Sequence, residues 1–234
     1  MIKYQGISTL EVLKEAKNYN KWIAENISEH LSTPILEIGA GTGNLTTYFL
    51  ENKPLYITDN DSGLVEDLKS KFKQFEKVFV ETLDIAKKPP KEYNSFFSTV
   101  FGINVLEHIK DDRAALKNIN SILKKDGKLV LLVPAKKRAF TKLDKELGHF
   151  RRYEKAELQK KLIDSGFNVE KIYYFNIVGL ISWYFRDKVK RNNIHLKPYH
   201  IKIFDSVVPF LKIVESMMEL PMGISLIAVA RKKS

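Results

Sequence analysis

The stretch "ILEIGAGTGN", residues 35–44, places three glycines directly after a short apolar run. Glycine has no side chain, so it permits positive φ angles and lets a ligand approach the backbone closely. Gly39, Gly41 and Gly43 occupy alternate positions, which predicts a strand that ends in a tight, ligand-binding turn. A turn without a ligand is the alternative, and it would suit one isolated glycine better than three.

Short apolar runs alternate with helical patterns along the rest of the chain. After the strand that begins with "ILEI", we expect strands at 55–58, 78–83, 95–105, 128–134, 167–175 and 225–232, and helices at 10–31, 44–52, 62–74, 111–124 and 154–165. Asp61 is a plausible N-cap, and "KKDG" at 124–127 is expected to close a helix. Alternating strands and helices imply an α/β fold whose doubly wound, parallel sheet binds ligands at the carboxyl ends of its strands.

Composition excludes several kinds of site. The chain has no cysteine, which removes disulfides, thiolate metal sites and cysteine nucleophiles, and we predict no metal site. The net charge of +11 favours polyanions, but the lysines are spread along the whole chain, as on an ordinary basic surface. No segment approaches the roughly 18 apolar residues of a spanning helix, and no signal-peptide region opens the chain. We therefore expect a cytoplasmic protein.

The spacing of the glycines discriminates between two classes of cofactor. A dinucleotide fingerprint has the order G-x-G-x-x-G, and Asn44 stands where its third glycine would be. Glu37 would also crowd a second anion against a pyrophosphate. A cofactor with a cationic end fits better, and the ammonium of an amino-acid moiety supplies that charge.

At this point the sequence resembles the class I S-adenosylmethionine-dependent methyltransferases, whose first motif is an acid followed by G-x-G-x-G. The order of motifs extends the resemblance over roughly residues 30–135, and the last strand also fits the family's pattern. The resemblance implies a Rossmann-like sheet, mostly parallel with a final antiparallel strand. It also implies S-adenosyl-L-methionine as cofactor and S-adenosyl-L-homocysteine as product.

The resemblance assigns roles to residues that follow the strands. Asp59 would accept hydrogen bonds from the ribose hydroxyls, Asp84 would receive the adenine amino group, and the backbone around Asn104 would meet the methionine part. A helix-entry residue and a solvated turn acid are the alternatives for the two aspartates. The full predicted cofactor-binding set is Glu37, Gly39, Ala40, Gly41, Gly43, Asn44, Asp59, Asn60, Asp84, Ile85 and Asn104.

The motif after the fourth strand bears on the acceptor. Enzymes of this family that methylate planar exocyclic amines typically carry N/D-P-P-aromatic there, whereas this chain has "NVLEH". We therefore do not expect a nucleobase amine as acceptor. The "LEH" triplet resembles the branch of the family that acts on small molecules and lipid-like acceptors. His108 is a candidate catalytic base, or alternatively a residue that shapes the pocket floor.

The segment 137–158 gathers further candidates, namely Asp144, His149, Arg151, Arg152 and Tyr153. Histidine has a pKa suited to proton abstraction, so His149 is the second candidate catalytic base. Arginines can clamp phosphate or carboxylate groups. The alternative is structural: the two arginines pair with acids, while the histidine and tyrosine pin the loop.

We expect a single methyltransferase domain over residues 1–234, with three parts. Residues 1–33 form a helical lid in which Tyr4, Tyr19 and Trp22 face the cofactor. Residues 34–135 form the cofactor-binding core, and 136–234 the acceptor-side half. A helical insertion at about 176–222 is expected to cover the acceptor pocket, or alternatively to meet a membrane surface or an acyl chain, since its aromatic residues are followed by basic ones.

The predicted function is methyl transfer from S-adenosylmethionine to an oxygen or nitrogen atom of a small molecule, such as a sugar or a lipid-linked compound. Two alternatives stay open. The basic composition would suit an RNA acceptor, and a non-catalytic module could hold the cofactor without turnover. We expect a small-molecule partner rather than nucleic acid, and the sequence leaves the oligomeric state undetermined.

Overall fold

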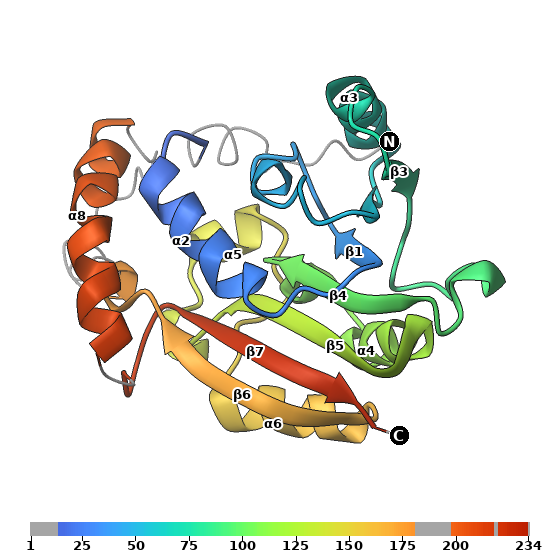
Figure 1. Ribbon diagram of the computed structural model, residues 1–234. Helices are drawn as coiled ribbons and strands as arrows, with labels where there is room; N and C mark the ends of the chain where they lie inside the picture. The colour runs from blue at the N-terminus through green and yellow to red at the C-terminus, as the bar shows by residue number, and fades with distance from the viewer. Residues whose placement is uncertain (1–13, 181–197, 218–219, 234) are drawn as a thin grey trace.

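The computed structural model describes residues 14–180, 198–217 and 220–233. Their seven strands form one sheet in the order β3-β2-β1-β4-β5-β7-β6 (Figure 1). The strands are β1 (Ile35–Ile38), β2 (Leu55–Asp59), β3 (Val78–Thr82), β4 (Phe97–Ile103), β5 (Leu123–Pro134), β6 (Phe167–Phe175) and β7 (Ser225–Lys232). Neighbours from β3 to β5 are parallel, and β7 runs antiparallel to both β5 and β6. The prediction of a mostly parallel sheet with a final antiparallel strand is confirmed.

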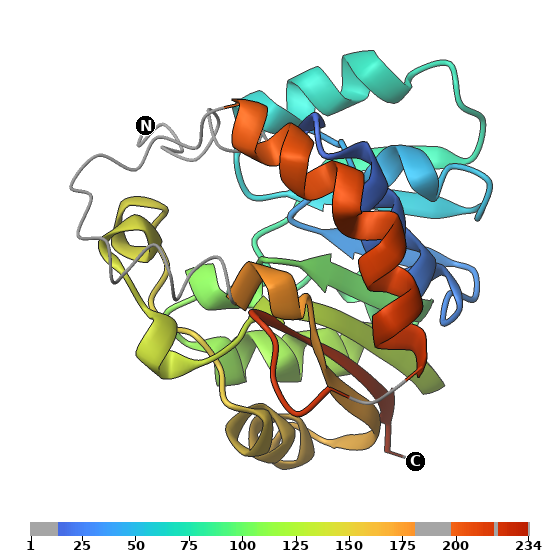
Figure 2. The same ribbon diagram turned by 90° about the vertical axis from the view of Figure 1, so that its left-hand side faces the viewer.

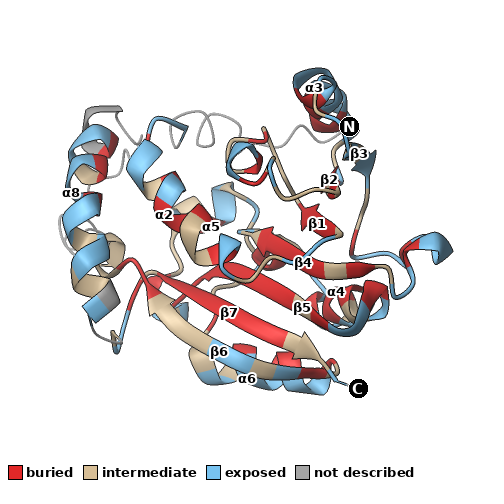
Figure 3. Ribbon diagram, viewed as in Figure 1, coloured by how far each residue is buried: buried red, intermediate tan, exposed pale blue. Residues whose placement is uncertain are grey.

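Helices cover both faces of the sheet, so the apolar core has two layers. The helices are α2 (Lys17–Ser28), α3 (Ser62–Phe72), α4 (Asp112–Ile122), α5 (Lys142–Glu146), α6 (Lys155–Asp164) and α8 (Pro198–Met217), with short 3-10 turns η1 (Thr46–Tyr48), η2 (Lys91–Tyr93), η3 (Leu106–His108) and η4 (Lys137–Ala139). Helices α4 and α6 pack on one face, and α2, α3 and α8 on the other. Figure 3 shows the central strands buried between these layers.

Two of the predicted helical features are wrong. The helix expected at 44–52 is reduced to η1, whose two consecutive threonines are poor helix formers. No α-helix therefore begins directly behind the glycine turn. The "KKDG" segment does not close a helix: α4 ends at Ile122, and residues 124–127 lie within β5, where the register against β4 shifts. Asp61 does cap α3, accepting hydrogen bonds from the amides of Gly63 and Leu64.

The chain reaches back from its C-terminal part to hold the first described helix. Ala16, at the N-cap of α2, offers no side-chain cap. Asp205 of α8 replaces it, because its carboxylate accepts the N–H groups of Asn18 at 3.1 Å and Tyr19 at 2.9 Å. A third hydrogen bond runs from Asn18 Nδ2 to the Asp205 carbonyl. Figure 2 shows α8 crossing over α2.

Helix α8 therefore covers α2, and α2 in turn covers the ligand-binding edge. The apolar side chains of α8 are only partly buried: Val208 is buried, but Val207 is 42% exposed. Residues 181–197 of the predicted insertion lie outside the described residues. No helix in the described ranges is long and apolar enough to cross a bilayer. The boundaries predicted at residues 33 and 135 stay a prediction.

Replacing Asp205 with alanine should lower the free energy of unfolding by about 1 kcal/mol, because two amides at the start of α2 lose their acceptor. Thermal or denaturant unfolding measures the change. Ser206→Ala is the matched control, since that hydroxyl is exposed and bonds only within α8. Equal stability of the two variants would contradict the capping role.

Candidate functional site

A cavity of about 820 Å³ opens at the carboxyl ends of the parallel strands. Its walls come from α2, the glycine turn, the segments that follow β2, β3 and β4, and residues 145–149. The parallel register brings these strand ends to one edge, as expected for this type of sheet. All of the predicted cofactor-binding residues line the cavity except Gly43.

Gly39 and Gly43 are both required by close packing, but against different parts of the protein. All three glycines of the turn have positive φ, from 58° to 68°. A Cβ at Gly39 would lie 2.4 Å from a methyl group of Val105, so this turn must stay bare to pack under η3. At Gly43, a Cβ would meet the side chains of Leu68 and Phe72 within 3 Å. Gly43 therefore serves the packing of α3 and does not reach the cavity.

Glu37 presents a buried acid to the cavity. It is 4% exposed, and its Oε2 has no hydrogen-bond partner among the described residues. Burial raises the pKa of Glu37 to about 7, and nearby Asp59 adds to the shift. The ammonium of Lys71 is engaged by the carbonyls of Thr42 and Gly43, each at 2.9 Å. A buried carboxylate oxygen without a partner fits a cationic ligand group, such as the ammonium of an amino-acid moiety.

The two predicted ribose- and adenine-binding acids are held by the backbone. Asp59 accepts the N–H of Gly41 at 2.8 Å through one oxygen and that of Asp61 at 3.0 Å through the other. Each carboxylate oxygen has a second lone pair, so this residue can shape the turn and still bind a ligand. Asp84 accepts the amide of Ala86 and lies 3.2 Å from the ammonium of Lys87. It thus combines the predicted position at the cavity with the features of a solvated turn acid.

The segment after β5 is organised around Asp144. Its carboxylate accepts hydrogen bonds from His149 Nδ1 at 2.9 Å, Arg152 Nε at 2.8 Å and the Thr141 amide at 2.8 Å. Although burial opposes ionisation, these bonds hold the pKa of Asp144 far below its usual range. An ionised carboxylate only accepts, so Nδ1 of His149 donates. When His149 is neutral, its lone pair is therefore on Nε2.

Arg151 and Tyr153 have structural partners. The guanidinium of Arg151 lies 2.8 Å from the carboxylate of Asp112. The buried hydroxyl of Tyr153 donates to Asp112 at 2.9 Å and reaches the Leu106 carbonyl. Together with the Arg152–Asp144 pair, these contacts match the structural alternative for both arginines and the tyrosine. They also fix the segment against η3.

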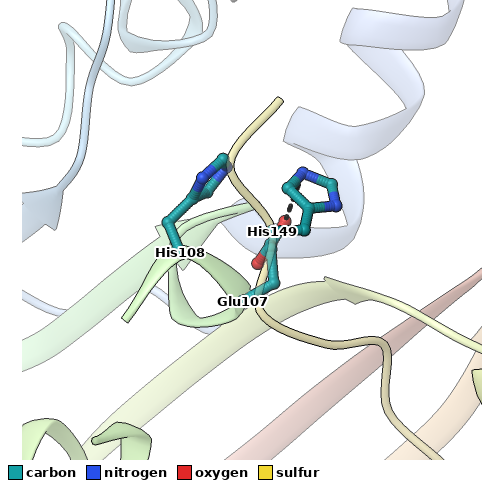
Figure 4. A group of neighbouring side chains, drawn as sticks. All are labelled: Glu107, His108 and His149. Atoms are coloured by element: carbon teal, nitrogen blue, oxygen red, sulfur yellow. Dashed lines mark ion pairs between the residues drawn. The ribbon is translucent and has the colours of Figure 1, made fainter. Parts of the chain in front are cut away.

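Glu107, His108 and His149 lie close together (Figure 4), and the two histidines line the floor of the cavity. Glu107 is fully buried, and its Oε1 lies 4.0 Å from His149 Nε2. Neither of its oxygens has a hydrogen-bond partner in the part of the chain that the structure describes. The two imidazole rings are 4.6 Å apart at 87°. Burial raises the pKa of Glu107 to about 8; burial and His149 lower that of His108 to about 4.

The structure thus brings together the two predicted catalytic histidines and adds Glu107, which the sequence did not single out. Glu107 belongs to the "LEH" triplet, but only the 3-10 turn η3 directs it inward. In the predicted lid, Tyr19 lines the cavity, whereas Trp22 is buried against Phe175, with ring centroids 4.2 Å apart. Tyr4 lies outside the described residues.

Comparison with known proteins agrees with this geometry. Residues 36–129 match the family model of a methyltransferase domain. The chain is 36% identical over 108 residues, 42% of its length, to a highly reducing polyketide synthase, GPY1, of Gibberella fujikuroi. It spans only 4% of the length of that synthase.

Two solved structures share the fold. The CurJ carbon methyltransferase has a TM-score of 0.61 and 19% identity, covering 98% of this chain and 59% of its own. The trans-methyltransferase CalH, solved in complex with SAH, has a TM-score of 0.54 and 20% identity, covering 85% and 51% respectively. The family match over residues 36–129, the shared fold and the glycine turn support the predicted resemblance to the class I S-adenosylmethionine-dependent methyltransferases.

Proposed function

We propose that the enzyme methylates an oxygen or nitrogen atom of a small molecule, such as a sugar or a lipid-linked compound. The observation that carries the proposal is the single cavity that joins the cofactor-binding turn to His108 and His149. Its volume of about 820 Å³ lies within the roughly 300–1,000 Å³ of small-molecule sites. A cytoplasmic location and contact with a membrane surface stay predictions from the sequence.

Residues at one end of the cavity would bind the cofactor, and residues at the other end would activate the acceptor. Bound S-adenosylmethionine supplies an electrophilic methyl group on a sulfonium. Glu37 would hold its ammonium and Asp59 its ribose, while Ile85 offers an apolar surface for the adenine. Alignment of acceptor and methyl group supplies much of the rate enhancement in such a displacement, up to about 7–11 kcal/mol.

His149 is the proposed catalytic residue for a hydroxyl acceptor, which keeps its proton at neutral pH. Asp144 fixes the ring so that the Nε2 lone pair is available at the cavity floor. That lone pair can take the proton directly or hold a Lewis acid that lowers the pKa of the hydroxyl. His108 lies beside it and shapes the floor.

An enolisable carbon is a second candidate acceptor. The relatives favour it, because the matched synthase makes polyketides by its name and CurJ is described as a carbon methyltransferase. A carbon acid also has to lose a proton before it attacks the methyl group, and His149 at the cavity floor could remove that proton as well.

Release of S-adenosylhomocysteine should be measured against sugars, lipid-linked alcohols, amines, β-keto thioesters and RNA. Methyl-labelled cofactor and NMR of the product then locate the methyl group. An O- or N-methyl product supports the main proposal, and a C-methyl product supports the second candidate. Methylated RNA, or cofactor binding without turnover on any acceptor, would contradict both.

The affinity for S-adenosylhomocysteine should rise about tenfold between pH 6 and pH 8. The pKa of Glu37 is about 7, so the carboxyl is neutral below that pH and attracts the ligand's ammonium only above it. At pH 8, Glu37→Gln should bind about 10–100-fold more weakly, as for loss of a charged hydrogen bond, and its affinity should not follow the wild-type pH curve. Calorimetry measures both, with exposed Glu66→Gln as control. A pH-independent wild-type affinity would refute this role.

His149→Asn should lower kcat by about 10²–10⁴-fold, the usual contribution of proton-transfer catalysis, and leave the affinity for S-adenosylhomocysteine within about twofold. Steady-state kinetics and calorimetry separate the two effects. His30→Asn is the control, because His30 does not line the cavity. A variant with wild-type turnover would exclude His149 as the catalytic residue.

A further inference from the structure

We propose that Glu107, His108 and His149 bind one divalent transition-metal ion at the floor of the cavity. The inference rests on the proposed function and says how the same site would activate a hydroxyl acceptor. Each side chain offers one ligand atom, and these atoms all lie within 4.8 Å of one another. The ligands come from η3 and from the segment after α5, which are far apart in the sequence.

The buried carboxyl group is the main reason for a cation here. Glu107 has no exposed surface, and neither of its oxygens has a hydrogen-bond partner among the described residues. Leaving such a group unsatisfied is costly. A metal ion between Glu107 and the two imidazoles would satisfy it, since a buried carboxylate is retained when it is paired or coordinates a metal.

The surroundings orient both histidines as they would for a metal. His149 gives its Nδ1 hydrogen to Asp144, which leaves Nε2 as the donor atom facing Glu107. Histidine ligands commonly donate their second nitrogen to a carboxylate in this way. Asp144 is itself fixed by Arg152. A hydrogen bond with the backbone of Gly148 engages His108.

The ligand set predicts which ions bind. Two imidazoles and one carboxylate suit Zn²⁺, Mn²⁺ or Fe²⁺, whereas Mg²⁺ and Ca²⁺ prefer oxygen ligands. Three protein ligands also leave a coordination position open for a substrate. Because both histidines line the cavity, that position is accessible to an acceptor.

The substrate class that follows is a hydroxyl compound that coordinates through oxygen, such as a phenol or a vicinal diol. Coordination lowers the pKa of the hydroxyl, and its proton passes to water. The oxygen then forms the bond to the methyl carbon as the carbon–sulfur bond breaks, and the sulfur keeps the electron pair.

The test measures metal binding directly, without turnover. The full chain is dialysed against a chelator and titrated with ZnCl₂, MnCl₂ or MgCl₂ by calorimetry, with metal content checked by elemental analysis. We expect one equivalent of Zn²⁺ or Mn²⁺ and at least tenfold weaker Mg²⁺. Co²⁺ in the site should give the visible absorption of a four- or five-coordinate nitrogen–oxygen site.

Glu107→Gln and His149→Asn should each weaken Zn²⁺ binding at least tenfold, while His30→Asn keeps one equivalent. Unchanged affinity for S-adenosylhomocysteine shows that each variant is folded. Absence of stoichiometric metal, or equal binding by the Glu107→Gln variant, overturns the proposal. If metal-free enzyme turns over fully and His149→Asn does not, the proposed function stands with His149 as a direct base. If metal binds but no acceptor is methylated, the metal site stands and the proposed function fails.

Discussion

The parallel hydrogen-bond ladder from β3 to β5 is the constraint on which the rest of the structure depends. It places the carboxyl ends of β1, β2, β3 and β4 at one edge. Every segment that leaves these ends must turn there, so residues separated by tens of positions meet around one cavity. The helices on both faces are needed because the central strands are apolar on each side.

Two buried acids lie at opposite ends of the proposed site. Glu37 at the glycine turn has one oxygen atom without a hydrogen-bond partner among the described residues, and Glu107 beside the two histidines has two. Burial raises the pKa of both. Each would be stabilised by a cationic group from outside the chain, an ammonium at one end and a metal ion at the other. Under the proposed function, Glu37 marks the cofactor end of the site and Glu107 the acceptor end.

The local errors of prediction have a common cause, which is that tertiary contacts override local signals. "KKDG" is typical of a helix end, but Leu123 and Lys128 on either side of it both pair with β4, so the segment lies within β5. Ala16 is a poor N-cap, yet α2 starts beside it because Asp205 of α8 supplies the missing acceptor. Where local and tertiary signals agree, the prediction is accurate to the residue: β6 and β7 have the bounds expected from the apolar runs.

The sequence by itself determined the sheet, the glycine turn and the cofactor class, because these depend on local periodicity and on residue types at fixed spacing. It also supplied His108 and His149 as candidates, together with the acids and arginines around them. Only the tertiary structure decided which of these groups meet. It paired Arg151 and Arg152 with acids, packed Gly43 against α3, and turned Glu107 inward. Such roles depend on distances between segments remote in the chain, and spacing along a sequence carries no information about those distances.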